Sequence, residues 1–182
     1  MIIGDVYKAI MNRIGEITTI KHIDMYSDQL DGDESLGDSF NYPAVFLTFR
    51  PGETITIGQN RQQIDMDIEV IVADHVIQSI SKREPEAIRN KGLSHLDLVD
   101  SVHAKLQGFN GYMVSPNLNF GTLNRTNLEP LSTYIKSNRG GISINGNVYR
   151  TRIILDSALP AYQKVTPDPA LEITQNMLPD ED

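Results

Sequence analysis

Residues 42–50 read Tyr-Pro-Ala-Val-Phe-Leu-Thr-Phe-Arg, and residues 64–72 read Ile-Asp-Met-Asp-Ile-Glu-Val-Ile-Val. The first stretch is apolar on both alternating faces, which is typical of a strand covered on both sides. The second alternates apolar and acidic residues, which is typical of a strand with one packed face and one face toward water or a partner. We predict that the two strands pair and that the rest of the chain packs around them.

Two groups of turn-forming residues lie between these strands. Pro51 and Gly52 follow the first strand, and Gly58 begins a second group with Gln59 and Asn60. Such residues supply the backbone conformations that tight turns need. The sequence therefore predicts either an antiparallel turn or a long flared hairpin.

The composition is that of an ordinary globular domain. The chain has 182 residues, of which 40% are hydrophobic and 22% charged. We expect a single α+β domain over residues 1–156. No run approaches the roughly 20 apolar residues of a membrane span, and no cleavable leader is recognisable, so we expect a cytoplasmic protein without a membrane partner. The absence of cysteine excludes disulfides, thiolate nucleophiles and cysteine-based zinc sites.

The charge balance argues against tight binding to nucleic acid. With 16 basic and 24 acidic residues, the formal net charge is −8. The chain therefore has no excess positive field to neutralise phosphates. A surface that repels phosphates is nevertheless compatible with a protein past which DNA must slide.

Two amphipathic helices are predicted, over residues 4–17 and 94–107. Apolar residues recur at spacings of three and four in both segments. Ser94 with Asp97 is a plausible N-terminal cap of the second helix, and Gly108 is a plausible stop. The residues of the two stripes are Ile3, Val6, Tyr7, Ile10, Ile14 and Ile17, then Leu96, Val99, Val102, His103 and Leu106. His103 is interpreted as a packed, hydrogen-bonded core histidine.

Further strands are predicted at residues 21–26, 112–114 and 131–136, with a polar, irregular segment at 117–130. Residues 78–91 are expected to be a surface connection or a poorly packed helix after Pro85. Asn145 and Gly146 have the sequence of a type I′ hairpin turn. They should separate a strand ending at Ile144 from one that continues to Leu155.

The acidic face of the strand at 64–72 is the main candidate site. Asp65, Asp67 and Glu69 lie on that face, and Arg150 and Arg152 are natural cross-strand partners for them. A magnesium site is the alternative, but the outer carboxylates are about 13 Å apart along a strand and cannot share one ion. The acidic loop over residues 24–38 likewise does not match a calcium-binding loop.

No motif for catalysis is recognisable. The chain contains no nucleophile elbow, no phosphate-binding glycine loop and no histidine pair at metal-ligand spacing. We therefore expect no enzymatic activity, no catalytic metal and no cofactor.

Residues 157–182 are predicted to form an extended arm. Four of the nine prolines lie there, and the apolar residues are too scattered for a core of their own. They are Leu159, Tyr162, Val165, Leu171, Ile173, Met177 and Leu178. We expect the arm to dock on a neighbouring subunit, and the alternative is that it folds back over its own domain.

The order of these motifs resembles that of the tail-terminator or tail-completion proteins of long-tailed bacteriophages, also described as head-to-tail joining proteins. After an N-terminal amphipathic helix come the Tyr-Pro-Ala-Val-Phe sequence at 42–46, the strand at 64–72, the helix at 97–108 and the aromatic-containing strand at 148–155. The resemblance implies an α+β fold in which a mainly antiparallel sheet with a long hairpin packs against two helices.

The resemblance also implies an assembly role in the virion. Subunits of this family form a homo-oligomeric ring, commonly a hexamer, that caps the tail tube, contacts tube and neck or connector proteins and leaves a channel for DNA. Assembly takes place in the host cytoplasm, DNA is not bound sequence-specifically, and there are no catalytic residues to carry over. The candidate assembly or channel-facing residues are Asp65, Asp67, Glu69, Arg150, Arg152, Tyr162, Leu171 and Met177.

Three alternatives stay open at this point. The chain could be another neck, connector or tail-tube component, a metal-dependent hydrolase that uses Asp65 and Asp67, or a monomeric cytoplasmic binding module. Divalent ions bound to the carboxylate face would favour the hydrolase. A light-scattering mass equal to one chain would favour the monomeric module.

Overall fold

The computed structural model describes residues 2–27, 30, 41–58, 61–76, 83, 85–129, 135–137 and 140–155. Six strands form one sheet in the order β1-β2-β3-β6-β4, with β5 also paired to β6. All neighbouring strands are antiparallel except β1 and β2, which are parallel. The elements are α1 (Ile2–Gly15), β1 (His22–Met25), β2 (Ala44–Gly58), β3 (Arg61–Val76), α2 (Glu86–Leu106), the 3₁₀ turn η1 (Gly111–Met113), β4 (Asn124–Glu129), β5 (Ile135–Ser137) and β6 (Gly140–Leu155).

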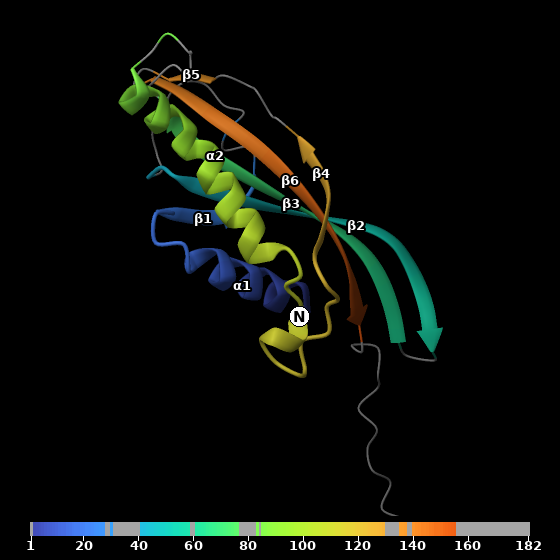
Figure 1. Cartoon of the computed structure of the whole chain (residues 1–182). Helices are drawn as coiled ribbons and strands as arrows, with labels where there is room; N and C mark the ends of the chain where they lie inside the picture. The colour runs from blue at the N-terminus through green and yellow to red at the C-terminus, as the bar shows by residue number, and fades with distance from the viewer. Residues whose placement is uncertain are drawn as a thin grey trace, which may run out of the picture.

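Both helices cover the same face of the sheet (Figure 1). Alternate residues of the strands point into this layer, so that Val45 and Leu47 of β2 and Met66, Ile68 and Val70 of β3 are buried against the helices. Burial of these apolar side chains is the main stabilising term of the fold. The predicted α+β class, with two helices packed on a mainly antiparallel sheet, is confirmed.

The opposite face of the sheet changes character along its length. Near one end, Ala44, Phe46, Ile71, Ala73 and Ile144 form a second buried apolar cluster. The prediction that residues 42–50 form a strand with two covered faces is therefore confirmed for this part of β2. Beyond Thr48 the same face carries charged residues.

The predicted hairpin is the long, flared form. β2 and β3 pair from the Ala44–Ala73 pair to the Gly58–Arg61 pair, with two register shifts on the way. Pro51 lies inside β2, where a register shift absorbs one extra residue, so the alternative of a short antiparallel turn is wrong. The ends of β2, β3 and β6 extend together past the helices as a curved part of the sheet (Figure 1).

The second helix is longer than predicted. It begins at Glu86, directly after Pro85, and the N–H of Arg89 donates to the carbonyl of Pro85 at 3.0 Å. Ser94 is therefore an interior residue, and its prediction as a cap is wrong, whereas the alternative of a helix after Pro85 is right. Proline suits a helix start because its fixed φ is helical and its missing N–H is not needed there. The predicted stop is confirmed, since Gly108 has φ 82°.

The predicted hairpin turn at Asn145 and Gly146 is wrong. Both residues lie inside β6, paired with Val72 and Ile71 of β3. The amide oxygen of Asn145 lies 2.7 Å from Nε2 of His95 on α2. Continuous pairing along the whole length of β3 thus outweighs the local turn preference of the Asn-Gly pair.

The segment after α2 also differs from the prediction. Residues 112–114 are not a strand: residues 111–113 form the turn η1, in which Asn110 Oδ1 accepts a hydrogen bond from the N–H of Met113. Within the segment predicted to be irregular, residues 124–129 form β4. Polar strands such as β4, with no alternation, give little sequence signal.

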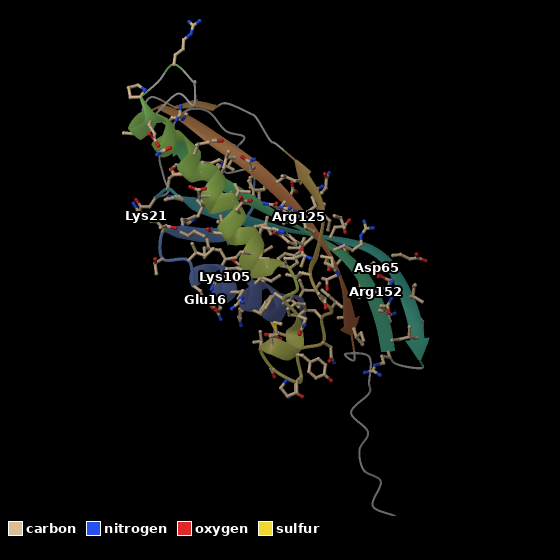
Figure 2. All side chains as sticks on the ribbon, in the orientation of Figure 1. Glu16, Lys21, Asp65, Lys105, Arg125 and Arg152 are labelled. Carbon is tan, nitrogen blue, oxygen red and sulfur yellow. The ribbon has the colours of Figure 1, made fainter. Side chains whose placement is uncertain are left out.

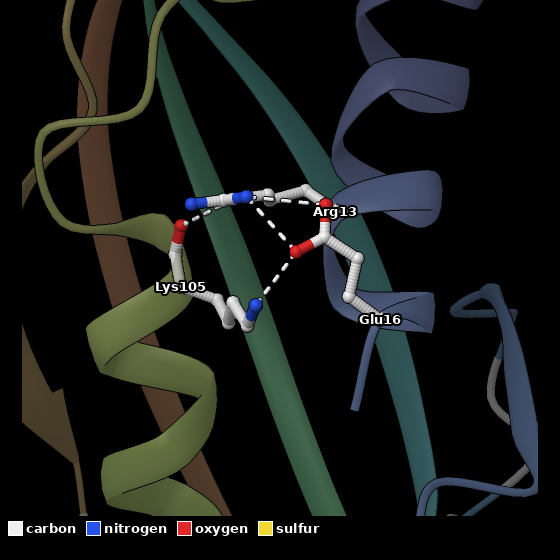
Figure 3. A network of polar contacts seen from close by, with 3 residues as sticks. All are labelled: Arg13, Glu16 and Lys105. Carbon is white, nitrogen blue, oxygen red and sulfur yellow. Dashed lines mark hydrogen bonds and ion pairs between the residues drawn. The ribbon is translucent and has the colours of Figure 1, made fainter. Parts of the chain in front are cut away.

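A polar network joins the C-terminal ends of the two helices (Figure 3). Arg13 donates to the carbonyl of Lys105 at 3.2 Å and to both oxygens of Glu16, and Lys105 Nζ donates to Glu16 at 2.6 Å. These hydrogen bonds lower the pKa of Glu16, and the bond from Lys105 has a larger effect than that from Arg13. The Arg13 guanidinium also lies over the ring of Phe109, 5.6 Å from its centroid.

Several predictions fall outside the described residues. They concern most of the acidic loop, the strand residues 131–134 and the whole arm from residue 157 to residue 182. Within the described part, the strand at 21–26 is confirmed as β1, residue 135 begins β5, and β6 ends at Leu155 as predicted. Neither described helix is both long and apolar enough to cross a membrane.

Candidate assembly surface

Three strands bring six charged side chains together on the face of the sheet that the helices do not cover. Register pairs Arg50 of β2 with Asp67 of β3 and Asp67 with Arg150 of β6, and in a neighbouring row it pairs Asp65 with Arg152. Figure 2 shows Asp65 and Arg152 on the extended part of the sheet, away from Glu16 and Lys105. We call Arg50, Asp65, Asp67, Glu69, Arg150 and Arg152 the charge ladder.

The strongest pair in the charge ladder is Asp67 with Arg150. Nε of Arg150 donates to one oxygen of Asp67 at 2.8 Å, and a second guanidinium nitrogen donates to the other oxygen at 3.0 Å. This bidentate geometry lowers the pKa of Asp67 and raises that of Arg150. The prediction that these two residues are cross-strand partners is confirmed.

The other two acids also have arginine partners. Asp65 accepts a hydrogen bond from Arg152 at 3.3 Å, as predicted. Glu69 is paired instead with Arg50, and its side chain is buried whereas that of Arg50 is 66% exposed. Sequence reasoning did not assign Arg50 to the site. The signal was available, because Arg50 ends the first strand quoted above and an antiparallel hairpin places it near these acids.

This arrangement does not favour metal chemistry. Three acids and three arginines cancel in charge, and both oxygens of Asp67 are occupied by Arg150. Among the residues that the structure describes, no three His, Cys, Asp or Glu side chains converge on a point where an ion could bind. The face is best described as a neutral, hydrogen-bonded surface.

Apolar side chains are exposed next to the charge ladder. After the register shift at Pro51, β2 continues as Thr54-Ile55-Thr56-Ile57, and Ile55 and Ile57 are 42% and 48% exposed. A second exposed group, Tyr112, Met113 and Val114, lies on η1 and the residue after it. Neighbouring apolar side chains that face solvent commonly mark protein contacts.

A depression of about 500 Å³ lies between the α1–β1 connection, the end of β3 and α2. Its lining mixes Lys21, Asp74 and Asp97 with hydroxyl side chains such as Ser94 and Ser101. No histidine is among the lining residues.

A half-buried histidine and a buried tyrosine support the sheet from the helix side. Nδ1 of His103 lies 3.1 Å from the hydroxyl of Tyr149, which is fully buried. Burial raises the pKa of Tyr149 and lowers that of His103. The prediction that His103 is hydrogen-bonded is confirmed, but His103 is half-buried and not a fully buried core residue.

Of the eight candidate site residues, the structure brings five together, since Asp65, Asp67, Glu69, Arg150 and Arg152 all belong to the charge ladder. Tyr162, Leu171 and Met177 lie outside the described residues. No protein-family model matches this chain, and neither does any sequence among the curated proteins.

Proposed function

We propose that this chain is a structural protein of a tailed bacteriophage. Copies of it form a ring at the head-proximal end of the tail, where the ring terminates the tail tube, joins the tube to the neck and leaves a channel for DNA. The proposal combines the order of the sequence motifs with the shape of the sheet.

The observation that carries the proposal is the extension of the sheet beyond its helices. β2, β3 and β6 have 15, 16 and 16 residues, whereas strands in globular proteins usually have 3 to 10. The helices cover only part of this length (Figure 1). A lone subunit would expose the face with the charge ladder and the β2 edge, where residues 51–58 are all exposed. An assembly that stacks or pairs sheets gives such an extension a role.

The charge distribution is compatible with a channel. The charge ladder is neutral as a whole, and the chain carries a net charge of −8. Neither feature retains a DNA backbone by attraction, so DNA would move past without being trapped.

The hydrolase alternative has no specific support. Its two carboxylates, Asp65 and Asp67, are bound to Arg152 and Arg150 and lie along one strand. A catalytic metal needs ligands that converge and oxygens that are free to bind it. We therefore propose an assembly protein and not an enzyme.

Electron microscopy of particles that contain this chain tests the proposal. Gold-labelled antibody should lie at the junction of head and tail, and averaged images should show the chain with rotational symmetry. Particles made without the chain should yield separate heads and tubes of unregulated length. A label elsewhere on the particle, an arrangement without rotational symmetry, or normal joining without the chain would refute the proposal.

A further inference from the structure

Sheets protect their edge strands, because an exposed row of backbone groups binds other strands. The β1 edge is only four residues long, and Asp24 accepts a hydrogen bond from the N–H of Met25 at 2.7 Å. The β4 edge has a register shift between Arg125 and Asn127, and the side chain of Gln107 accepts from the N–H of Arg125 at 3.0 Å. Both outer strands are therefore poor acceptors for a further strand.

The outer edge of β2 has a protected and an unprotected part. Pairing with β1 covers residues 44–47, and Arg50, Pro51 and the adjacent register shift protect the middle. Residues 54–57 contain no charge and no proline, and the next register shift comes only after Thr56. In the part of the chain that the structure describes, no strand pairs with this outer edge.

An uncharged Thr-Ile-Thr-Ile edge strongly favours strand addition, because threonine and isoleucine are β-formers and the side chains of both isoleucines are exposed. A strand that covers this edge needs apolar residues at alternating positions, opposite Ile55 and Ile57. It also needs a backbone without proline where it pairs.

The chain itself continues from a point near this edge. Leu155, the last residue of β6, pairs with Gln62, close to the end of the hairpin. Residues 156–170 can span up to about 50 Å when extended. The chain after residue 170 can therefore reach the β2 edge of an adjacent copy.

The C-terminal segment has the sequence that this edge requires. The longest proline-free part of the arm lies between Pro169 and Pro179, and it contains Leu171 and Ile173 at alternating positions. The three prolines before it favour an extended linker.

We infer that residues 171–174 of one copy add a strand to residues 54–57 of a second copy. This inference rests on the proposed self-assembly, and it identifies the two surfaces that would contact each other in the assembly. Main-chain hydrogen bonds supply affinity in such strand addition, and alternating side chains supply specificity. Because donor and acceptor are different surfaces, the contact is head-to-tail, which is the type of contact that closes into a ring.

The absence of cysteine allows a direct test by cross-linking. One preparation carries Ile55→Cys, and a second, longer by a tag, carries Ile173→Cys. The two are mixed at a concentration where light scattering shows a mass above one chain, and they are treated with a short bis-maleimide. We expect a cross-linked species of one tagged and one untagged chain. Leu128→Cys, on the protected β4 edge, is the matched control and should not cross-link to Ile173→Cys.

Four outcomes overturn the inference. Cross-linking of Ile55→Cys to itself would show that two β2 edges pair with each other. A chain with both substitutions that cross-links only internally would show that the arm covers its own edge. Absence of any link between positions 55 and 173, or a mass of one chain at every concentration, would show that no strand is donated.

A charge exchange provides a second test. Ile55→Lys with Ile57→Lys should weaken association about tenfold or more without changing the melting temperature of the monomer, because both side chains are exposed. Leu171→Glu with Ile173→Glu in the same chain should restore association. Failure of this rescue would contradict the proposed pairing.

The two proposals fail separately. If positions 55 and 173 cross-link but the protein is not at the tail junction, only the proposed phage function is contradicted. If the protein forms a ring at the junction but positions 55 and 173 do not cross-link, only the inferred strand donation is contradicted.

Discussion

At Asp67, both carboxylate oxygens accept hydrogen bonds from Arg150, so a divalent ion would have to displace the guanidinium before binding. Calorimetric titration with Mg²⁺, Mn²⁺ or Ca²⁺ is therefore expected to show no tight site. A micromolar site that is present in the wild type and lost in Asp67→Ala would contradict this expectation. Glu53→Gln, an exposed acid on β2, is the control for a non-specific loss of negative charge.

His103 should give the protein a defined pH dependence. Burial lowers the pKa of His103 below its ordinary value of 6.5. As the pH falls, His103 takes up a proton more readily in the unfolded chain than in the folded chain. The free energy of unfolding should therefore be highest above pH 6.5 and should decrease as the pH falls toward the lowered pKa. Urea unfolding at about pH 8 and about pH 5.5 measures the difference.

The difference in stability between these two pH values should shrink in His103→Gln, which does not titrate. His22→Gln, on the half-buried strand β1, should keep it. An unchanged pH dependence in His103→Gln would show that another group is responsible.

Among the secondary-structure elements, those with strong periodicity were predictable from the sequence. The apolar stripe of α1 and the alternation in β3 are each repeated over many residues, so one packed face is specified several times. The same alternation predicted Arg150 and Arg152 as partners for the acidic face, and the structure pairs them with Asp67 and Asp65. Most of the charge ladder could thus be assembled before the structure was known.

Elements that depend on distant partners were not predictable. Asn145 and Gly146 look like a turn locally, but β3 is long enough to pair with β6 through both residues. β4 has almost no apolar residues, and only its pairing with β6 makes it a strand. The unprotected edge at residues 54–57 is also invisible locally, because it depends on where β1 ends and where the β2 register shifts.

The loop between α2 and β4 depends on one close approach. A Cβ atom at Gly111 would overlap the carbonyl oxygen of Leu118, and Gly111 also donates its N–H to Phe120 at 3.0 Å. Gly111→Ala should therefore lower the free energy of unfolding by about 1–3 kcal/mol. Gly4→Ala, in α1 and with nothing within 4 Å of the added atom, should leave stability unchanged or raise it.

Chemical denaturation of both glycine variants measures this contrast. Equal effects of the two substitutions would show that the Gly111 contact relaxes without cost.

In the whole molecule, the sheet has two different halves. One half is covered by helices on one face and by a second apolar cluster on the other, and it holds the domain together. The other half is buried on its helix side as well, but its opposite face carries the charge ladder, and the exposed isoleucines of β2 lie at its edge. Substitutions of buried residues should act on stability, and substitutions on the exposed face and edge should act on association.

Removal of residues 158–182 tests whether the arm contributes to the stability of the monomer or to association. If the arm docks on a neighbour, the truncated monomer should keep nearly the same melting temperature, because the described residues of the domain already form a buried core. Its assembly, measured by light scattering and electron microscopy, should be impaired.

Removal of residues 179–182 alone is the control, because it spares all seven apolar residues of the arm, and it should leave assembly intact. A large loss of monomer stability with normal assembly would instead show that the arm belongs to its own core, since its apolar residues would then be buried by folding and not by association.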